Sequence, residues 1–466
     1  MIEEIPGRPT WKPRVERNGK SVYLSIAEAL ESDIGESALK PGDRLPPQRD
    51  LADFLGVNLT TVTKAYRVCE RKGLICATVG KGTFVSSDAN IPGAAREEEE
   101  GRLIEMGMLH PRCGQSELVG EAIRRVAQQS TIGSFFDYDE PRLKKSQGET
   151  GVEWLKRFRR FARAEDVLVA SGAQNALAVT LLSLFQAGDR IGVDCLTYMG
   201  FKSLANLFGI RLLPIEMSDT GMSAEGLERA CKAEKLKGLY LMPECQNPTT
   251  CTMDLSLRRK IAQIVSANRL ILIEDGTYSF LGNTELPPVS ELAPEQSVYI
   301  SSTSKSLSAG LRVAFMAVAP QFRDRVSRGI YSVNLNTSHF NVAIVADLVA
   351  TKAADQILRE RRREAEARNK IVDEALGGFT VRGNKRDLFR WLILPEGWTG
   401  KEFELCAQVA GVRLFCADRF SVGGDPAPAA VRIATSSVGT RGELIRGLDI
   451  LKGLLREEPG KSPLIV

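Results

Sequence analysis

The stretch that decides the fold of this 466-residue chain is residues 301–312, which read Ser301-Ser302-Thr303-Ser304-Lys305-Ser306-Leu307-Ser308-Ala309-Gly310-Leu311-Arg312. A short apolar run, Val298–Ile300, precedes it, and another, Val313–Val318, follows it. A lysine among hydroxyl side chains directly after a buried strand is typical of open α/β sheets, where ligands collect at the carboxyl ends of the strands. We therefore expect a sheet here, with a binding site at the end of one strand.

Further apolar runs occur on both sides of this stretch, with helical patterns between them. The other runs are Val167–Ala170, Arg190–Val193, Gly238–Met242 and Leu270–Ile273. This alternation predicts a mostly parallel sheet with crossover helices. From about Gly329 the pattern begins helical and then has strand-like pieces at 389–393 and 430–434, which predicts a smaller α+β lobe. We expect a large lobe at about 130–330 and a small lobe at about 331–466.

Polar residues with complementary chemistry follow several of these runs. Pyridoxal phosphate needs a lysine for its aldehyde, an acid against its ring nitrogen, a stacked aromatic ring and a phosphate cradle, which a helix N-terminus supplies. The candidates are Lys305 for the aldehyde, Asp275 for the ring nitrogen, Tyr198 for stacking, and Gly172, Ala173, Gln174, Ser302, Ser304 and Arg312 for the phosphate. Each pattern alone usually has a structural explanation, such as a helix cap or a surface lysine. Their conjunction in this order predicts a pyridoxal phosphate site.

The first part of the chain has a different pattern. Tyr23–Ile34 carries apolar residues at helical spacing, Gln48–Leu55 reads as a short helix that Gly56 ends, and a second helix begins at Asn58. Residues 74–85 alternate and turn at Gly80-Lys81-Gly82, as a two-stranded wing does. These patterns predict a winged helix-turn-helix at 21–86. A Pro-rich charged arm, 1–20, precedes it, and a glutamate-rich linker, 87–102, joins it to a second domain at 103–466.

The net charge of +4 is concentrated in this first domain. The segment from residue 40 to residue 81 has eight basic residues and four acidic ones, so it carries the whole excess. The basic residues are Lys40, Arg44, Arg49, Lys64, Arg67, Arg71, Lys72 and Lys81. Such a local excess fits a surface that contacts the phosphate backbone of DNA. Ordinary solvated helix faces are the alternative, and charge alone does not decide between them.

Composition argues against several other classes of protein. No stretch approaches eighteen apolar residues, and the start, Met1-Ile2-Glu3-Glu4, does not resemble a signal peptide, so we expect a cytoplasmic protein without a membrane span. Nine cysteines without a C-x-x-C pair favour reduced thiols over disulfides or a zinc site. With His110 and His339 as the two histidines, we expect no metal centre.

From about Leu103 to the end, the chain resembles the fold-type I pyridoxal phosphate proteins of the aspartate aminotransferase group. The resemblance implies that Lys305 is the Schiff-base lysine and that Asp275 is the partner of the pyridine nitrogen. It implies ring-hydroxyl contacts from Asn247 and Tyr278, a carboxylate-binding role for Arg432, and a reach from Tyr138 to the phosphate of a neighbouring subunit. Asn247 lies in Gln246-Asn247-Pro248-Thr249, where Thr250 replaces the glycine of the family motif.

Residues 23–86 resemble the winged helix-turn-helix of the GntR family through six short matches in order. The matches are 39–46, 49–52, Gly56-Val57, Thr60-Thr61-Val62, Ala65-Tyr66 and 80–85. The helix that starts at Asn58 would enter the major groove of the operator. The expected DNA contacts are Arg44, Arg49, Asn58, Thr60, Thr61, Lys64 and the wing residue Lys81. Leu59 stands where many relatives have arginine, so one base contact is lost or replaced by contact with a thymine methyl.

Together the two resemblances describe the MocR-type branch of the GntR family. They imply a head-to-tail homodimer on double-stranded DNA and a transcriptional regulator that senses a small amino-group effector or pyridoxal phosphate itself. The alternative is an active aminotransferase with an accessory DNA-binding module. Steady turnover with an amino donor and a keto acceptor would distinguish the enzyme from the sensor.

Overall fold

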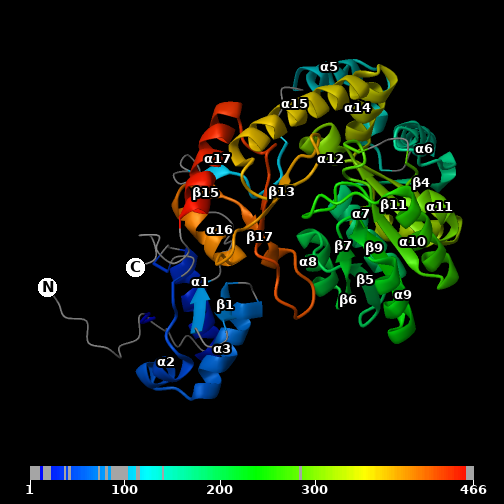
Figure 1. The fold of residues 1–466 in the computed structure, drawn as a ribbon. Helices are drawn as coiled ribbons and strands as arrows, with labels where there is room; N and C mark the ends of the chain where they lie inside the picture. The colour runs from blue at the N-terminus through cyan, green and yellow to red at the C-terminus, as the bar shows by residue number, and fades with distance from the viewer. Residues whose placement is uncertain are drawn as a thin grey trace. The chain divides into compact units, whose positions relative to one another are not determined.

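A computed structural model of the chain describes residues 11–13, 22–35, 38–39, 43–71, 74–78, 82–85, 103–111, 116–138, 141–282 and 286–457. The chain divides into two compact units, residues 1–102 and 103–466. The predicted linker 87–102, most of the predicted arm 1–20 and the predicted DNA contact Lys81 lie outside the described residues. Each unit is described by itself (Figure 1).

The first unit is a three-helix domain with a two-stranded wing. Its elements are α1 (Val22–Gly35), α2 (Gln48–Leu55), α3 (Leu59–Arg71), β1 (Ile75–Thr78) and β2 (Gly82–Val85). Gly56 ends α2 in the left-handed conformation, with φ 62°, which is available to glycine at little cost. The strands pair antiparallel, with Ile75 opposite Val85. Ile26, Leu51 and Val62 bury the inner helix faces in one core. The predicted winged helix-turn-helix is confirmed.

The second unit is built on a seven-stranded sheet of order β4-β12-β11-β10-β9-β5-β6. The strands are β4 (Val167–Ala170), β5 (Arg190–Asp194), β6 (Arg211–Ile215), β9 (Leu236–Leu241), β10 (Ile271–Asp275), β11 (Ser297–Ser302) and β12 (Ala314–Val318). Only the pairs that involve β12 are antiparallel within this sheet. The predicted mostly parallel sheet is therefore confirmed, and each predicted apolar run lies on one of its strands.

Helices cover both faces of this sheet (Figure 1). Tyr240 and Ile273 face one core, which α7 (Ala173–Leu184), α13 (Pro320–Asn334) and α14 (His339–Ala350) share. Leu239 and Leu272 face the other core, which α9 (Ala224–Ala233) and α10 (Leu255–Ala267) close. Because the strands are buried on both faces, they read as continuous apolar runs rather than as alternating patterns.

The small lobe has its own sheet, of order β13-β14-β17-β16. Its elements are β13 (Val381–Arg382), β14 (Arg390–Ile393), α16 (Gly400–Val409), β16 (Phe415–Cys416), β17 (Ala430–Ile433) and α17 (Arg441–Arg456). The predicted boundary at about 331 differs from the packing, because α14 and the first half of α15 (Ala353–Leu376) belong to the large-lobe core. The small-lobe core begins near Val372, and it also takes in Met106 from the start of the unit.

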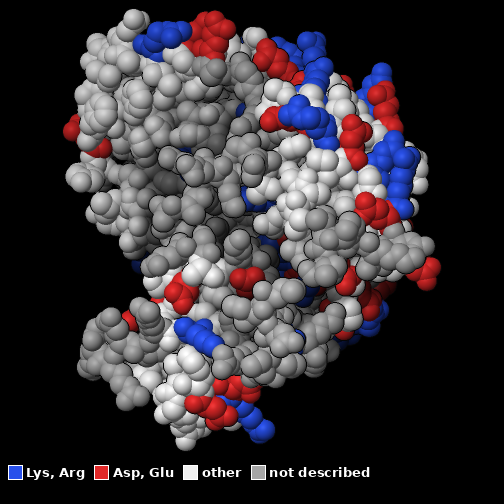
Figure 2. Space-filling model, turned by 90° about the vertical axis from the view of Figure 1, so that its left-hand side faces the viewer, with Lys and Arg blue, Asp and Glu red and all other residues white. Residues whose placement is uncertain are grey.

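On the described part of the face that Figure 2 shows, Lys and Arg side chains lie interspersed with Asp and Glu side chains. No described helix is long and apolar enough to cross a membrane. The described residues contain no group of three or more His, Cys, Asp or Glu that would hold a metal ion.

Candidate functional site

The predicted cofactor residues meet at the carboxyl ends of the central strands. Asp275 ends β10, Ser302 ends β11, and Lys305 lies on the single helical turn α12 (Thr303–Ser306) directly after β11. Ser171-Gly172 joins the end of β4 to the N-terminus of α7. Neighbouring parallel strands end at the same edge of a sheet, which explains why residues far apart in the sequence come together here.

Lys305 is largely buried, and its Nζ donates a hydrogen bond to the carbonyl oxygen of Leu109. Burial, together with the positive charges of Arg432, Arg312 and Arg361, lowers the pKa of Lys305 to about 8. A lysine with such a pKa has an appreciable neutral fraction near pH 7.5. A neutral amine is the form that attacks an aldehyde carbon.

A cationic cradle surrounds the start of α7. Arg312 donates from Nη1 to Ser304 Oγ at 3.0 Å and from Nη2 to the carbonyl oxygen of Ser171 at 3.2 Å. Gly172 has φ 92°, and a Cβ at this position would lie 2.5 Å from Nη2 of Arg312. The guanidinium therefore rests against the glycine, next to the positive end of a helix, where an anion such as a phosphate binds.

Asp275 is buried and accepts two hydrogen bonds. The backbone N–H of Thr277 donates to Oδ1 at 3.0 Å, and the hydroxyl of Tyr240 donates to Oδ2 at 3.1 Å. Burial raises the pKa of Asp275, and the hydrogen bonds from Thr277 and Tyr240 act in the opposite direction. No described Lys or Arg forms an ion pair with Asp275, so a cation next to it would favour the carboxylate form.

The predicted ring contacts also lie near this site. The hydroxyl of Tyr198 donates to Gln174 Oε1 at 3.1 Å, and Gln174 Nε2 donates to the carbonyl oxygen of Gly200, so Gln174 orients Tyr198. Tyr278 is buried, with its ring edge against Phe389. Tyr138 is 78% exposed and is not part of the cradle within one chain.

Arg432 lies on β17 and is 2% exposed. Its Nη1 donates to Asn247 Oδ1 at 2.6 Å, its Nη2 donates to the carbonyl oxygen of Gly107 at 2.5 Å, and its buried Nε has no hydrogen-bond partner. Burial lowers the pKa of Arg432 to about 10. No described carboxylate forms an ion pair with this guanidinium. A buried cation of this kind is suited to an incoming carboxylate.

Three phenylalanine rings surround the guanidinium of Arg432. The rings of Phe389, Phe415 and Phe420 have their centroids 5.5, 5.6 and 4.9 Å from its Cζ atom. The rings keep water away from the charge, and their faces partly offset its desolvation. Thr250, which replaces the glycine of the family motif, adopts φ 65°, a left-handed conformation that glycine adopts at little cost.

The DNA-facing candidates lie on α2, on α3 and before α2. Arg44, Arg49, Thr60 and Lys64 are exposed, and Thr61 is half-buried. Asn58 is exposed, but its side chain also stabilises the local fold. Its Oδ1 accepts hydrogen bonds from the backbone N–H and from the hydroxyl of Thr60, each at 2.9 Å. Asn58 therefore caps α3, as its side chain is well suited to do. Thr63 Oγ1 donates to Gln48 Oε1 and fixes α3 against α2.

Sequence reasoning missed three contacts of the candidate site. Tyr240 read as an ordinary core residue of an apolar strand, although a buried tyrosine needs a partner for its hydroxyl. The other two are the hydrogen bonds that the carbonyl oxygens of Gly107 and Leu109 accept; because backbone groups make them, no side-chain pattern predicts them.

Comparison with known proteins covers both units. A model of bacterial regulatory proteins of the gntR family matches residues 22–85, and a model of class I and II aminotransferases matches residues 108–451. The uncharacterized HTH-type transcriptional regulator YdeF of Bacillus subtilis is 39% identical over 447 residues, which are 96% of this chain and 97% of that protein. The probable rhizopine catabolism regulatory protein MocR of Rhizobium meliloti is 25% identical over 82% of this chain and 80% of that protein.

A solved structure supports the same division. LysN, an α-aminoadipate aminotransferase from Thermus thermophilus complexed with N-(5'-phosphopyridoxyl)-L-leucine, superposes with a TM-score of 0.68 at 25% identity. It covers 78% of this chain and 95% of its own, as expected for an enzyme without the N-terminal unit. The long match to YdeF spans both units, which a match to an aminotransferase alone does not. The chain belongs to the MocR-type subgroup of the GntR family, in which a winged helix-turn-helix is joined to a fold-type I aminotransferase domain.

Proposed function

We propose that this DNA-binding transcriptional regulator uses its aminotransferase domain to sense a small molecule that carries an amino group and a carboxylate. The observation that carries the proposal is Arg432, a buried guanidinium without a described carboxylate partner, near enough to Lys305 for its charge to lower the pKa of that lysine. The same chain also contains the winged helix-turn-helix domain of the GntR family.

The residues present fit pyridoxal 5'-phosphate, the cofactor of class I and II aminotransferase domains. When bound, the cofactor supplies an aldehyde that bonds to primary amines. Lys305 would hold it covalently, Asp275 would keep its ring nitrogen protonated, and Arg312 with the start of α7 would hold its phosphate. The cradle closed by Gly172 and the buried carboxylate without a described cation both support this fit.

The effector in this proposal has two recognition points. Its amine competes with Lys305 for the aldehyde, and its carboxylate binds Arg432, which Asn247 orients. A ligand shifts a conformational equilibrium only through different affinities for the two states. Arg432 lies on the small lobe and Lys305 on the large lobe, so a ligand that bridges them favours one arrangement of the lobes. Pyridoxal phosphate itself is the other candidate signal, and it would bind through Arg312 and Lys305 without Arg432.

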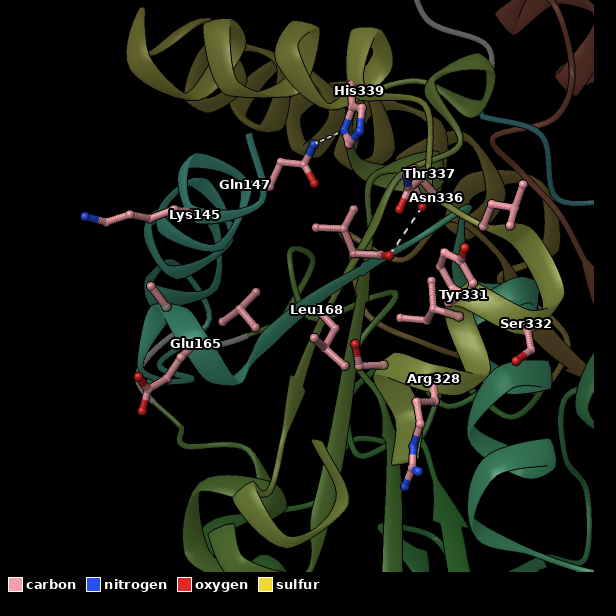
Figure 3. Close-up of a pocket in the computed structure, with 16 residues that line it drawn as sticks. Lys145, Gln147, Glu165, Leu168, Arg328, Tyr331, Ser332, Asn336, Thr337 and His339 are labelled. Carbon is pink, nitrogen blue, oxygen red and sulfur yellow. Dashed lines mark hydrogen bonds between the residues drawn. The ribbon is translucent and has the colours of Figure 1, made fainter. Parts of the chain in front are cut away.

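A second copy of the chain is part of the proposal, in a head-to-tail homodimer. A cavity of about 900 Å³ lies along the edge strand β4, where Leu168, Tyr331 and Asn336 are among its lining residues (Figure 3). Asn336 Nδ2 donates to the carbonyl oxygen of Tyr138, whose ring is exposed. An unpaired sheet edge with exposed aromatic side chains suits an interface, and Tyr138 would reach the phosphate of the partner subunit from it.

The rival function is an active aminotransferase with an accessory DNA-binding module. The same lysine, aspartate and arginine serve that chemistry, so slow transfer of an amino group is compatible with the pocket. The GntR match and the full-length regulator relatives favour the sensor. We further propose that the protein acts in the cytoplasm, on nucleoid DNA.

One experiment separates the two functions. The affinity of the full-length protein for an operator fragment, selected from random DNA, is measured with pyridoxal phosphate and a panel of amino acids, alongside steady-state turnover with each amino acid and a keto acid. We expect a change in DNA affinity with at least one amino acid, and little turnover. Rapid multiple turnover with a DNA affinity that no amino acid changes would contradict the sensor.

A further inference from the structure

The segment Ile104–His110, here called the strap, opens the second unit and lies across the small lobe. Its first part, β3 (Ile104–Glu105), pairs in parallel with β15 (Val412–Arg413), and the N–H of Met106 donates to the carbonyl oxygen of Arg413 at 2.8 Å. The N–H of Ala434, just after β17, donates to the carbonyl oxygen of Met106 at 2.7 Å, and the N–H of His110 donates to Ser437 Oγ at 3.0 Å. The strap is therefore attached to the small lobe at both ends.

Between these attachments, the strap contacts both cations of the pocket. Arg432 Nη2 donates to the carbonyl oxygen of Gly107, and Lys305 Nζ donates to that of Leu109. Gly107 also lies against the ring of Phe415, and a Cβ at this glycine would be 2.9 Å from that ring. The strap thus occupies donors of the two groups that would bind the effector's carboxylate and the cofactor's aldehyde.

The turn in the strap depends on one carboxylate. Glu105 Oε1 accepts the N–H groups of both Gly107 and Met108, each at 2.8 Å. Its Oε2 accepts a hydrogen bond from Arg413 Nη1 at 3.2 Å. Glu105 forms no hydrogen bond with Lys305 or Arg432 in these contacts; it positions the Gly107 carbonyl, and its negative charge also raises the pKa of Arg432.

We infer that the strap transmits effector binding to the DNA reader, because it is both a ligand-sensitive part of the pocket and the continuation of the linker. A carboxylate on Arg432 places a full negative charge beside the carbonyl oxygen of Gly107, which carries partial charge of the same sign. The contact weakens and the strap loosens from the small lobe, and because the strap directly follows the linker in the sequence, this change reaches the segment that joins the two units. The inference rests on the proposed function and names the part that carries its signal.

The first test uses two reduced cofactor adducts that differ by one carboxylate. They are N-(5'-phosphopyridoxyl)-L-leucine and N-(5'-phosphopyridoxyl)-3-methylbutylamine, each bound to the full-length protein after removal of its cofactor. Hydrogen exchange is measured for the N–H groups of Met106, Gly107 and Met108. We expect about tenfold faster exchange with the leucine adduct than with the amine adduct, within the range of local opening equilibria. Equal or slower exchange with the leucine adduct would overturn the inference.

The second test compares two substitutions of capping glutamates on the same lobe. Glu105→Ala removes the carboxylate that holds the strap, and Glu402→Ala removes one that caps α16 through Thr399 and has no described hydrogen bond with the strap. The operator affinity of each variant is measured in its unliganded form and with each adduct. We expect the leucine adduct to change the affinity of wild type and Glu402→Ala by about fivefold or more, and that of Glu105→Ala by less than about twofold.

The outcomes separate the strap from the function on which it rests. Suppose that the strap of Glu105→Ala exchanges faster than that of wild type, but the leucine adduct changes its operator affinity as much as in wild type. That result would refute transmission through the strap and leave the proposed sensing function intact. If neither adduct binds wild type, or neither changes its operator affinity, the proposed function fails, and the strap fails with it. If Glu105→Ala does not fold, the exchange comparison in wild type still decides.

Discussion

The hydroxyl of Tyr240 donates a hydrogen bond to Oδ2 of Asp275 at 3.1 Å. This bond and the N–H of Thr277 keep the pKa of a fully buried carboxyl group from rising further. The negative charge of Asp275, on which a pyridine nitrogen would depend in the proposed function, is therefore favoured from inside the core, by a residue one strand away on β9.

Tyr240→Phe should weaken pyridoxal phosphate binding most at low pH. Without the hydroxyl, the pKa of Asp275 rises, so the carboxylate becomes neutral at a higher pH than in wild type. Binding that needs the charged form is then lost earlier as the pH falls. We expect about a tenfold loss of affinity at pH 6, the equivalent of one hydrogen bond to a charged group, and a smaller loss at pH 8. Absorbance titration over pH 5–8 measures it, and a pH-independent loss would contradict the role assigned to Tyr240.

The rate at which pyridoxal phosphate attaches covalently to the apoprotein should follow the titration of Lys305. The neutral amine reacts, and the pKa of Lys305 is lowered to about 8 by burial and by neighbouring cations. The rate should therefore rise with pH to a midpoint near 8. Stopped-flow absorbance gives the rate, and borohydride reduction with peptide mapping gives the site. A midpoint near that of a free lysine, or a label on another lysine, would refute the assignment.

Replacing either of the two cations that we propose to bind the effector and the cofactor should impair the effector response, each in a different way. Lys305→Ala should fold and bind DNA, yet lose the change in DNA affinity caused by the effector. Arg432→Ala should raise the effector concentration required by roughly 10- to 100-fold, as expected for a lost hydrogen-bonded charge pair. Arg441→Ala is the matched control, because Arg441 is an arginine of the same lobe that pairs with Glu364 on the surface. A wild-type response in Lys305→Ala would exclude sensing through this lysine.

Operator binding should depend on salt through the basic residues of the first unit. Arg49→Ala and Lys81→Ala should each weaken binding and reduce the slope of log affinity against log salt by about 1, because each removes one phosphate contact. The cofactor spectrum should not change. Lys260→Ala, which removes an exposed lysine of the second unit, should leave the slope unaltered. If Arg49→Ala and Lys81→Ala both keep the wild-type affinity and slope, the proposed DNA contacts of the first unit are wrong.

Thr250 should limit the stability of the loop that carries Asn247. A β-branched residue at φ 65° is strained, and glycine is not. Thr250→Gly and Thr250→Ala both remove the buried side chain, but only the alanine retains the strain. The glycine variant should therefore be more stable than the alanine variant by about 1 kcal/mol in urea or thermal unfolding. A more stable alanine variant would show that the strain is unimportant here.

The predictable parts of this protein are those that short sequence patterns specify. Lys305 could be found because a strand, a cluster of hydroxyl residues and Arg312 follow one another along the chain. The assignment of α14 to the small lobe failed because the helix is apolar almost all round, and such a helix does not reveal which core it joins. Asn58 was expected to contact bases or phosphates, which stays a prediction; its second role, capping α3, could also have been predicted, because asparagine directly before a helix is a strong capping residue.

Contacts between distant residues were harder to predict. Arg432 and Asn247 are 185 positions apart, and their hydrogen bond exists because two lobes meet there. The contacts of the Gly107 and Leu109 carbonyl groups were harder still to predict from the sequence, since every residue has such a group. The predicted roles of the site residues remain predictions, and the experiments above test them.

The strap contacts have a consequence for how regulators of this kind diversify. Two main-chain carbonyl groups make the contacts with Arg432 and Lys305, so the exposed side chain of Met108 can change during evolution without erasing them, whereas Met106 and Leu109 are fixed in the two cores. In the proposed mechanism, substitutions at Met108 would therefore leave the route from the effector to DNA binding unaltered.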